Sequence, residues 1–334
     1  LNGQTINNTT TISGTGLSLT GAITNSNASA ATLSGNITLG AHSSIGGSNN
    51  VTLSGVISGA YNLTKVGSST YTLSGTNTYS GDTTISNGTI KLTGAVNTLT
   101  DLIIASGATL DLQATQTFAR LDLDGTISNS TGSSELTISG TSDLGGSITT
   151  SGTQDYEGAV TVTGNSTLTT TSAQITFDTT VNSETDETNN LTITASELQV
   201  DGIIGGSRTL GAISITGILD LNAAITNATS LSVSSTSDLG ADVTTTGDQT
   251  YTGAAVLSSN VILTTTANGS VYFGSTVDGG YDLDITTNGT GDVTFVGAVG
   301  GTTPLGDITI STNEFTAASI TAGNLNVTHT GAGS

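Results

Sequence analysis

Short triplets of the form apolar–polar–apolar recur along the chain and set its pattern. Each triplet places two apolar side chains on one face of an extended segment, which is the alternation of a β-strand with one buried face. The triplets return about every 8–12 residues, with Gly, Asn, Asp and Ser between them, as strands separated by tight turns do. Examples are Val51–Leu53, Tyr71–Leu73, Ile90–Leu92, Leu110–Leu112, Leu121–Leu123, Leu136–Ile138 and Ile213–Ile215.

This rhythm fits two architectures, an antiparallel sandwich array and a β-solenoid, and three features favour the solenoid. The apolar runs are very short. Aromatic residues make up only 4% of the chain, so few large side chains are present to fill the space between two packed sheets. Thr and Asn recur at outward and turn positions, where stacked coils form ladders of equivalent side chains. We therefore predict an all-β chain folded as a parallel β-helix (β-solenoid), in which each coil packs on its neighbours.

The alternation also predicts the register of the core. In the triplet Leu110–Asp111–Leu112, both leucines should be buried and Asp111 should be exposed to water.

A long internal repeat covers the second part of the chain. The segment that begins at Thr141 returns at Thr236, 95 residues later, and the Gln-x-Tyr-x-Gly element at Gln154 returns at Gln249. Residues 1–140 do not share this repeat. Because no Pro-rich or charged linker separates them, we expect residues 1–140, 141–235 and 236–334 to be three sections of one continuous solenoid.

An ordered series of short motifs occupies residues 62–94. In order and spacing, this series resembles the passenger-associated transport repeat of autotransporter proteins. The segment 105–112 is similar to the stretch that comes after the repeat in those passengers. The motifs are Leu63-Thr64-Lys65, Thr72-Leu73-Ser74-Gly75, Asn77-Thr78-Tyr79-Ser80-Gly81 and Thr83-Thr84-Ile85.

The two 95-residue sections show a second, looser resemblance, to repeats of filamentous-haemagglutinin-like and other giant bacterial surface proteins. It depends on the Gln-x-Tyr-x-Gly-Ala and Gly-Gly-x-x-x-Leu-Gly elements. Together, the two resemblances imply a right-handed parallel β-helix that is exported across the outer membrane and is displayed at the cell surface or released. They do not imply a particular ligand.

Acidic residues far outnumber basic ones, 25 against 4, and the formal net charge is −21. Nucleic-acid binding needs basic side chains that replace the counterions of phosphate, so we exclude nucleic acid as a partner. Anionic membrane surfaces also repel such a chain. We expect the dispersed charge to keep a β-rich surface soluble.

The chain contains no Cys and no Met. The lack of Cys agrees with export, because a disulfide formed in an oxidising periplasm would close a loop before the chain threads an outer-membrane pore. Since residue 1 is not Met, we interpret the sequence as a piece of a longer protein. It has no signal-peptide pattern, and no run approaches the roughly 18 apolar residues of a membrane-spanning helix.

Few residue combinations suggest chemistry. The two histidines, His42 and His329, are far apart in the sequence, and without Cys a zinc site lacks ligands. Two acid pairs could begin a calcium site or a general acid–base pair, but neither completes a calcium loop. Apolar residues alternate with these acids, so we expect the acids to face water. We predict no catalytic, cofactor-binding or metal-binding residues, and no cofactor. The acid pairs are Asp122/Asp124 and Asp282/Asp284.

These observations favour a structural role. Carbohydrate-cleaving β-helices need clustered carboxylates with basic and aromatic residues, and this chain has four basic residues and no Trp. We predict a non-catalytic stalk or filament segment of a large secreted bacterial adhesin at the outer-membrane surface. The alternatives are a self-associating matrix or sheath component, and a carbohydrate-binding or carbohydrate-active β-helix. The expected partners are a host or neighbouring-cell surface, a polysaccharide or further copies of the chain, without membrane insertion.

Overall fold

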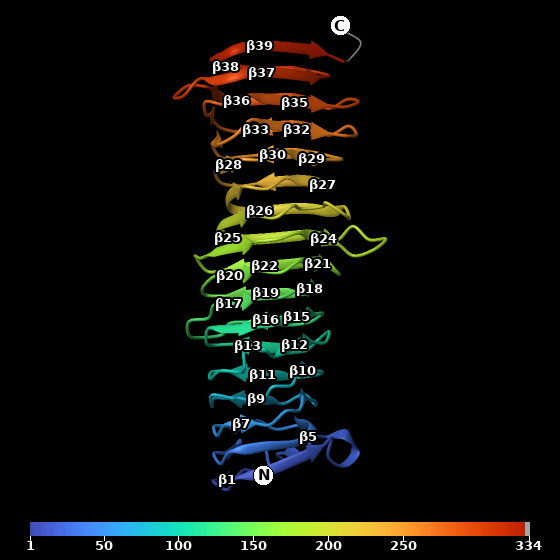
Figure 1. Cartoon of the computed structure of the whole chain (residues 1–334), viewed down its shortest axis with the longest axis vertical. Helices are drawn as coiled ribbons and strands as arrows, with labels where there is room; N and C mark the ends of the chain where they lie inside the picture. Colours follow the sequence, from blue (N-terminus) through green and yellow to red (C-terminus); the bar gives the residue numbers. More distant parts are fainter. Residues whose placement is uncertain (331–334) are drawn as a thin grey trace. The chain divides into compact units, whose positions relative to one another are not determined.

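The computed structural model describes residues 1–330, and nearly all of their regular structure is β-strand (Figure 1). The one helix in this range is a single 3-10 turn, η1 (Leu17–Leu19). The strands pair in parallel with segments about one coil away, as when Leu63 pairs with Thr83 and Thr83 with Leu102. The predicted all-β, parallel β-solenoid is confirmed, and its right-handed winding stays a prediction.

Residue contacts divide the chain into two compact units. The first comprises Leu1–Gly158 with Thr169–Thr171, and the second comprises Ala159–Leu168 with the chain from Ser172 onward. The division at residues 140 and 235 that the sequence repeat predicts stays a prediction.

Parallel stacks of short strands build the first unit. Each turn of chain adds one strand to each stack, and β5 is long enough to pair with several shorter strands. One stack contains β2 (Thr10–Gly14), β3 (Ile23–Thr24), β5 (Ile37–Gly46), β7 (Ile57–Ser58), β8 (Leu63–Lys65), β10 (Thr83–Ile85), β12 (Asp101–Ile104), β15 (Arg120–Leu123) and β18 (Ser142–Leu144). The second contains β1 (Thr5–Ile6), β4 (Ala31–Leu33), β6 (Val51–Leu53), β9 (Thr70–Leu73), β11 (Thr89–Leu92), β13 (Thr109–Leu112), β16 (Thr126–Ser128) and β19 (Ser147–Thr150). A third begins later, with β14 (Gln116–Phe118), β17 (Leu136–Ile138) and β20 (Gln154–Tyr156).

The core of the first unit consists of columns of apolar side chains. In one column, Tyr71, Ile90, Leu110 and Ile127 are in register on successive coils, and all four are buried. Leu112 is also buried, so the predicted register of this triplet is confirmed. A slip of one residue would turn every such side chain toward water, so burial on one face fixes the register.

The prediction that Asp111 is exposed is wrong. The side chain lies on the outer face, but the turn after β16 folds over it, and only 9% of its surface is exposed. The backbone N–H and the hydroxyl of Ser130 donate to its two carboxylate oxygens at 2.9 and 2.7 Å, and Gln113 Nε2 donates at 2.9 Å. These hydrogen bonds replace water around the buried carboxylate.

Strands of the second unit follow the same plan but include several longer ones. Three of the longer strands pair with two different strands of a neighbouring coil: β26 with β27 and β28, β27 with β29 and β30, and β36 with β33 and β34. The strands are β21 (Val160–Val162), β23 (Gln174–Phe177), β24 (Val181–Ser183), β25 (Leu191–Val200), β26 (Leu210–Leu221), β27 (Ile225–Val233), β28 (Ser237–Leu239), β29 (Val243–Thr245), β30 (Gln249–Tyr251), β31 (Ala255–Leu257), β32 (Val261–Thr265), β33 (Val271–Phe273), β34 (Val277–Asp278), β35 (Leu283–Thr287), β36 (Val293–Val299), β37 (Leu305–Thr312), β38 (Phe315–Ile320) and β39 (Ala322–His329), while β22 (Ser166–Thr170) has residues in both units.

Aromatic rings stack inside the second unit. Tyr251, Phe273 and Phe295 occupy equivalent positions on β30, β33 and β36, with ring centroids 4.9 and 5.1 Å apart and nearly parallel planes. The sequence supplies few aromatic residues, and the parallel register brings these onto one another, where stacking adds to the free energy of burial.

Candidate functional site

The motif series of residues 62–94 surrounds a lysine that points into the core. Lys65 is at the inward end of β8 and has no exposed surface. Its Nζ donates hydrogen bonds to the carbonyl oxygens of Val66 at 2.9 Å, Gly67 at 2.7 Å and Asn87 at 3.2 Å. Because Asn87 lies on the next coil, the ammonium group ties two successive turns together.

An aromatic ring covers the same ammonium group. Lys65 Nζ lies 5.5 Å from the centre of the Tyr71 ring, within the range of a cation–π contact. Burial lowers the pKa of Lys65 to about 8. The Tyr71 hydroxyl lies 2.6 Å from the carbonyl oxygen of Gly46 and 2.7 Å from that of Ile23, and burial raises its pKa. This pair therefore links the coil of the repeat to the two coils before it.

Asn77 makes a second link between coils. Its side chain is buried, its Oδ1 accepts from the backbone N–H of Ile57 at 3.0 Å, and its Nδ2 donates to the carbonyls of Gly75 and Ala95, both at 3.0 Å. Ile57 lies one coil before Asn77 and Ala95 one coil after it. An amide has both donors and an acceptor, so this one side chain satisfies backbone groups on both sides.

Two further motif residues fit the close stacking of the coils, one by a buried ring and one by the lack of a side chain. The buried Tyr79 hydroxyl lies 2.6 Å from Thr83 Oγ1, and burial raises the pKa of Tyr79 to about 12. A Cβ atom added at Gly75 would lie 2.5 Å from the carbonyl oxygen of Gly55, so the coils approach each other too closely for any other residue.

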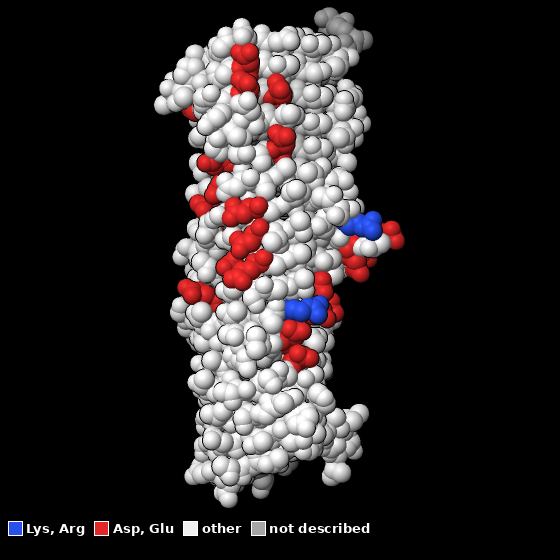
Figure 2. All heavy atoms as spheres, in the orientation of Figure 1, with Lys and Arg blue, Asp and Glu red and all other residues white. Residues whose placement is uncertain are grey.

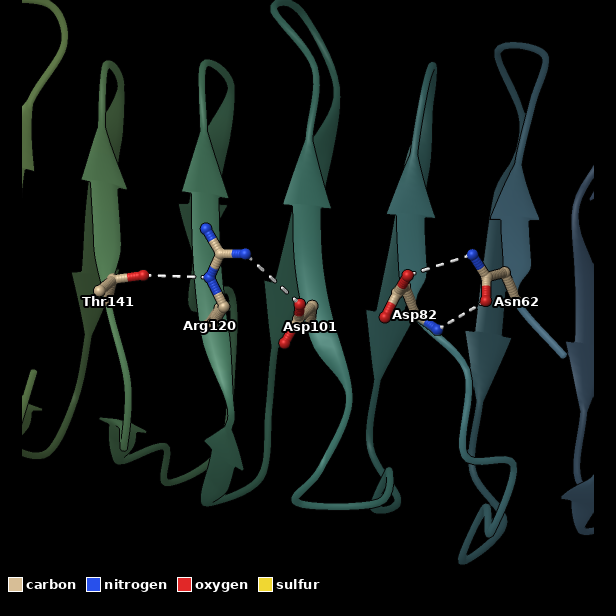
Figure 3. Close-up of polar contacts among 5 residues, drawn as sticks. All are labelled: Asn62, Asp82, Asp101, Arg120 and Thr141. Carbon is tan, nitrogen blue, oxygen red and sulfur yellow. Dashed lines mark hydrogen bonds and ion pairs between the residues drawn. The ribbon is translucent and has the colours of Figure 1, made fainter. Parts of the chain in front are cut away.

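On the outer face, a row of polar side chains lies at or just before the start of the strands of the first stack, one from each coil (Figure 3). Asn62 and Asp82 are joined twice, by Asn62 Nδ2 to the Asp82 carboxylate and by the Asp82 N–H to Asn62 Oδ1, both at 3.1 Å. Arg120 lies between Asp101, at 4.0 Å, and Thr141, to which its Nε donates at 3.0 Å. An exposed ion pair of this length contributes little free energy.

A small cavity opens beside Arg120. Its volume is about 80 Å³, well below the roughly 300–1,000 Å³ of sites that hold small molecules. Burial, followed by the charges of Asp124 and Asp143, raises the pKa of Asp122, and Arg120 opposes this shift. The cavity is lined by Asp101, Leu102, Ile103, Arg120, Leu121 and Asp122.

In the second unit, Asp220 and Asp238 are in register on adjacent coils. Burial raises the pKa of Asp220, the hydrogen bond to Asn222 opposes this, and the charges of Asp238 and Asp201 add to it. Asp238 Oδ1 is buried and has no hydrogen-bond partner. Within residues 1–330, no group of three or more His, Cys, Asp or Glu side chains is placed to hold a metal ion.

The structure leaves the residues considered as candidates for chemistry, the two histidines and the two acid pairs, dispersed on the surface. His42 Nδ1 accepts from the N–H of Asn62 at 3.2 Å and its ring meets that of Tyr61 edge to face, while His329 lies near the carbonyl of Asn313 at 3.4 Å. Both histidines are exposed. All four members of the acid pairs at 122/124 and 282/284 are also exposed, as predicted.

The repeated Gln-x-Tyr element is a buried hydrogen-bond network. Gln154 Nε2 donates to Thr150 Oγ1 at 3.2 Å and to the carbonyl of Thr169 at 2.8 Å, and the Tyr156 hydroxyl donates to Gln154 Oε1 at 3.1 Å. The sequence showed the repeat but not this hydrogen-bonding role of its Gln and Tyr residues. The equivalent residues 95 positions later make the same contacts, with distances of 3.2, 2.9 and 3.4 Å, and they are Thr245, Gln249, Tyr251 and Thr264.

Comparison with protein families matches residues 63–92 to the passenger-associated transport repeat, which confirms the resemblance to autotransporter passengers. This repeat indicates a secreted, surface-exposed passenger. A search of curated proteins and a search of solved structures found no match. No helix within residues 1–330 is long and apolar enough to span a membrane.

Proposed function

We propose that the chain is a non-catalytic stalk segment of a large secreted adhesin at the bacterial outer-membrane surface. The observation that carries this proposal is the inward orientation of the transport repeat. Lys65 and Asn77 use their polar atoms to join successive coils, so these two side chains of the matched repeat stabilise the stack. A stalk needs such cohesion between coils, because each coil contacts only its neighbours.

The hydrogen bonding of the outer carboxylates also supports a structural role. In the second unit, a carboxylate on one coil repeatedly accepts a backbone N–H of the next coil. Three examples have distances of 2.8, 2.7 and 3.0 Å. These oxygens satisfy turn amides that the parallel pairing leaves free. The pairs are Asp242 with Ile262, Asp282 with Asp307, and Asp292 with Glu314.

A binding assay with coated beads tests the stalk proposal against the adhesive alternatives. Beads that carry the purified chain should bind to cells and to immobilised polysaccharides no better than beads that carry an unrelated protein of equal net charge. Saturable binding that the free chain competes away would show that this segment itself contacts a receptor or a glycan, and the stalk proposal would be wrong.

The non-catalytic part of the proposal has a separate test. Incubation of the purified chain with neutral and acidic polysaccharides should release no oligosaccharide. Reproducible release that disappears in the variant Asp122→Asn would place a hydrolase or lyase site at the small cavity beside Arg120. The matched control is Asp178→Asn, a change to an exposed acid on a different turn.

A further inference from the structure

The charge of this chain is distributed very unevenly. All 25 acidic residues lie at Asp82 or beyond, and residues 1–81 contain one charged side chain, the buried Lys65. On the face shown in Figure 2, the region of the earliest strands accordingly carries no Asp, Glu, Lys or Arg. A partner that is itself strongly negative is repelled by the later coils and meets no such repulsion here.

The same uncharged region contains two of the three most exposed leucines of the first unit, and the third is Leu99. The loop between β2 and β3 carries η1, in which Leu17 is 90% exposed and Leu19 is 70% exposed. Ser18 and Leu19 have φ angles of 54° and 62°, a conformation that side chains other than Gly rarely adopt. The loop is closed by a hydrogen bond from the N–H of Gly21 to the carbonyl of Thr15 at 2.9 Å. It therefore holds two leucines away from the core at a cost in backbone strain.

A hollow lies beside this loop. Its volume is about 410 Å³, and one of its walls is Leu19. Thr20 and the glycine and serine residues of the two following coils form the rest, so the hollow is lined with small uncharged groups that can admit an apolar side chain. The lining residues are Leu19, Thr20, Gly47, Ser48, Gly67 and Ser68.

We propose that this loop and its hollow form a contact between two copies of the chain. The surface has a projecting leucine, Leu17, and an adjoining hollow, so a two-fold symmetric contact would place the leucine of each copy against the hollow of the other. A second copy carries a charge of −21, and residues 1–81 are the part of each copy that meets the other without placing carboxylates side by side. The patch is small, so the dimer is weak and forms at high local concentration. This inference goes beyond the proposed stalk function, which stands whether or not the copies associate.

Sedimentation of the purified chain over a range of protein and salt concentrations tests the proposal. The wild-type chain should form a dimer that strengthens as salt increases, because salt screens the repulsion between the acidic coils and leaves the apolar contact intact. The double variant Leu17→Ser with Leu19→Asn should remain monomeric under the same conditions; Asn suits the positive φ of residue 19. The matched control Leu99→Ser, which changes another exposed leucine of the same unit, should dimerise as the wild type does.

A charge variant makes the test independent of the loop conformation. Ser48 is exposed on the wall of the hollow, and Ser48→Asp should abolish the dimer at low salt and restore it in part at high salt. A wild-type chain that stays monomeric throughout would overturn the proposal, as would a dimer that survives both the loop variant and Ser48→Asp. If the wild type is monomeric but binds phosphatidylcholine vesicles through Leu17 and Leu19, the loop contacts lipid and the proposed self-contact is wrong.

Discussion

At the scale of single residues, the face of the coil that a side chain occupies decides how its burial is stabilised, by apolar packing or by hydrogen bonds. Leu112 and Asp111 are neighbours on β13, and both are buried, but the leucine packs in the apolar column while the carboxylate depends on hydrogen bonds from Ser130 and Gln113. Lys65 is buried on the inner face as Leu112 is, but it depends on hydrogen bonds as Asp111 does, because its charged end donates to carbonyl groups.

Leu112→Ala should lower the free energy of unfolding by about 2–5 kcal/mol, because it removes buried methyl groups and leaves a cavity that the stacked neighbours cannot fill. Denaturation in urea, followed by circular dichroism, measures the change. Asp122→Ala alters an exposed position on β15 and should change the stability by no more than about 0.5 kcal/mol. Equal effects of the two substitutions would contradict the packing described for the core.

Lys65 should make the stability depend on pH. Its pKa in the folded chain is about 8, below the ordinary value of 10.5. Between these values the unfolded chain still holds the proton that the folded chain has released, so stability due to Lys65 rises as the pH increases through this window. The buried tyrosines, whose pKa values are raised, act in the opposite direction only near pH 10 and above.

Comparison of the wild type with Lys65→Met isolates this effect. The stability of the wild type relative to the variant should increase between pH 7 and roughly pH 9.5, as measured by urea denaturation at each pH. A difference that is independent of pH over this range would mean that Lys65 keeps its ordinary pKa and that its ammonium group is not desolvated.

At the scale of strands and turns, close approach between coils is the main constraint. The Cβ of an alanine at position 75 would lie 2.5 Å from the carbonyl oxygen of Gly55, so either the coils separate or the turn distorts. Gly75→Ala should therefore destabilise the chain by about 1–3 kcal/mol, measured by the shift of the thermal midpoint. Gly280→Ala is the control, because a Cβ there meets no atom within 4 Å, and it should be nearly neutral.

Acids in register on adjacent coils also affect stability. Because the pKa of Asp220 is raised, the folded state binds its proton more tightly than the unfolded state, so its contribution to stability is lost as the pH rises above the ordinary range of an aspartate. Asp220→Asn should thus stabilise the chain at pH 7, by less than about 1 kcal/mol for this half-exposed group, and the gain should vanish near pH 3. Asp178→Asn, a change to an exposed acid of the same unit, is the control and should leave the stability at pH 7 nearly unchanged. A gain from Asp220→Asn at pH 7 that persists at pH 3 would exclude the charge of Asp220, with its burial and its repulsion by neighbouring acids, as the source of the gain.

The sequence predicts the strands well, because alternation over three residues decides which side chains can be buried. It does not predict the turns. Asp111 has the same alternation as Asp122, and only the turn at Asn129 and Ser130, which folds back over β13, makes the difference between them. The inward direction of Lys65 follows from its place in the triplet Leu63–Lys65, but the charge of a lysine argues for the surface until its carbonyl partners are known.

At the scale of the whole molecule, the net charge of −21 is the property that governs solubility. The isoelectric point is about 4.1, so the repulsion between molecules disappears as the pH falls toward that value. Solubility should therefore pass through a minimum near pH 4.1, which turbidity measurements at graded pH can detect. The minimum should be shallower for the double variant at Leu17 and Leu19 if their loop contributes to contacts between copies. A solubility that is constant from pH 7 to pH 4 would show that charge repulsion does not keep the molecules apart.

The parallel pairing between coils has a consequence for the speed of folding. Strands pair with segments one coil away in the sequence, 20 residues for Leu63 with Thr83, 27 for Thr5 with Thr32 and 17 for Leu305 with Ala322. The entropy lost in closing a loop depends on the length of that loop, so every added coil meets the same barrier. Proteins whose contacts are far apart in sequence usually fold slowly, and the separation normally grows with chain size. Here the separation stays near the length of one coil however many coils there are, so a chain of this kind can be lengthened by evolution without a corresponding delay in reaching its native state.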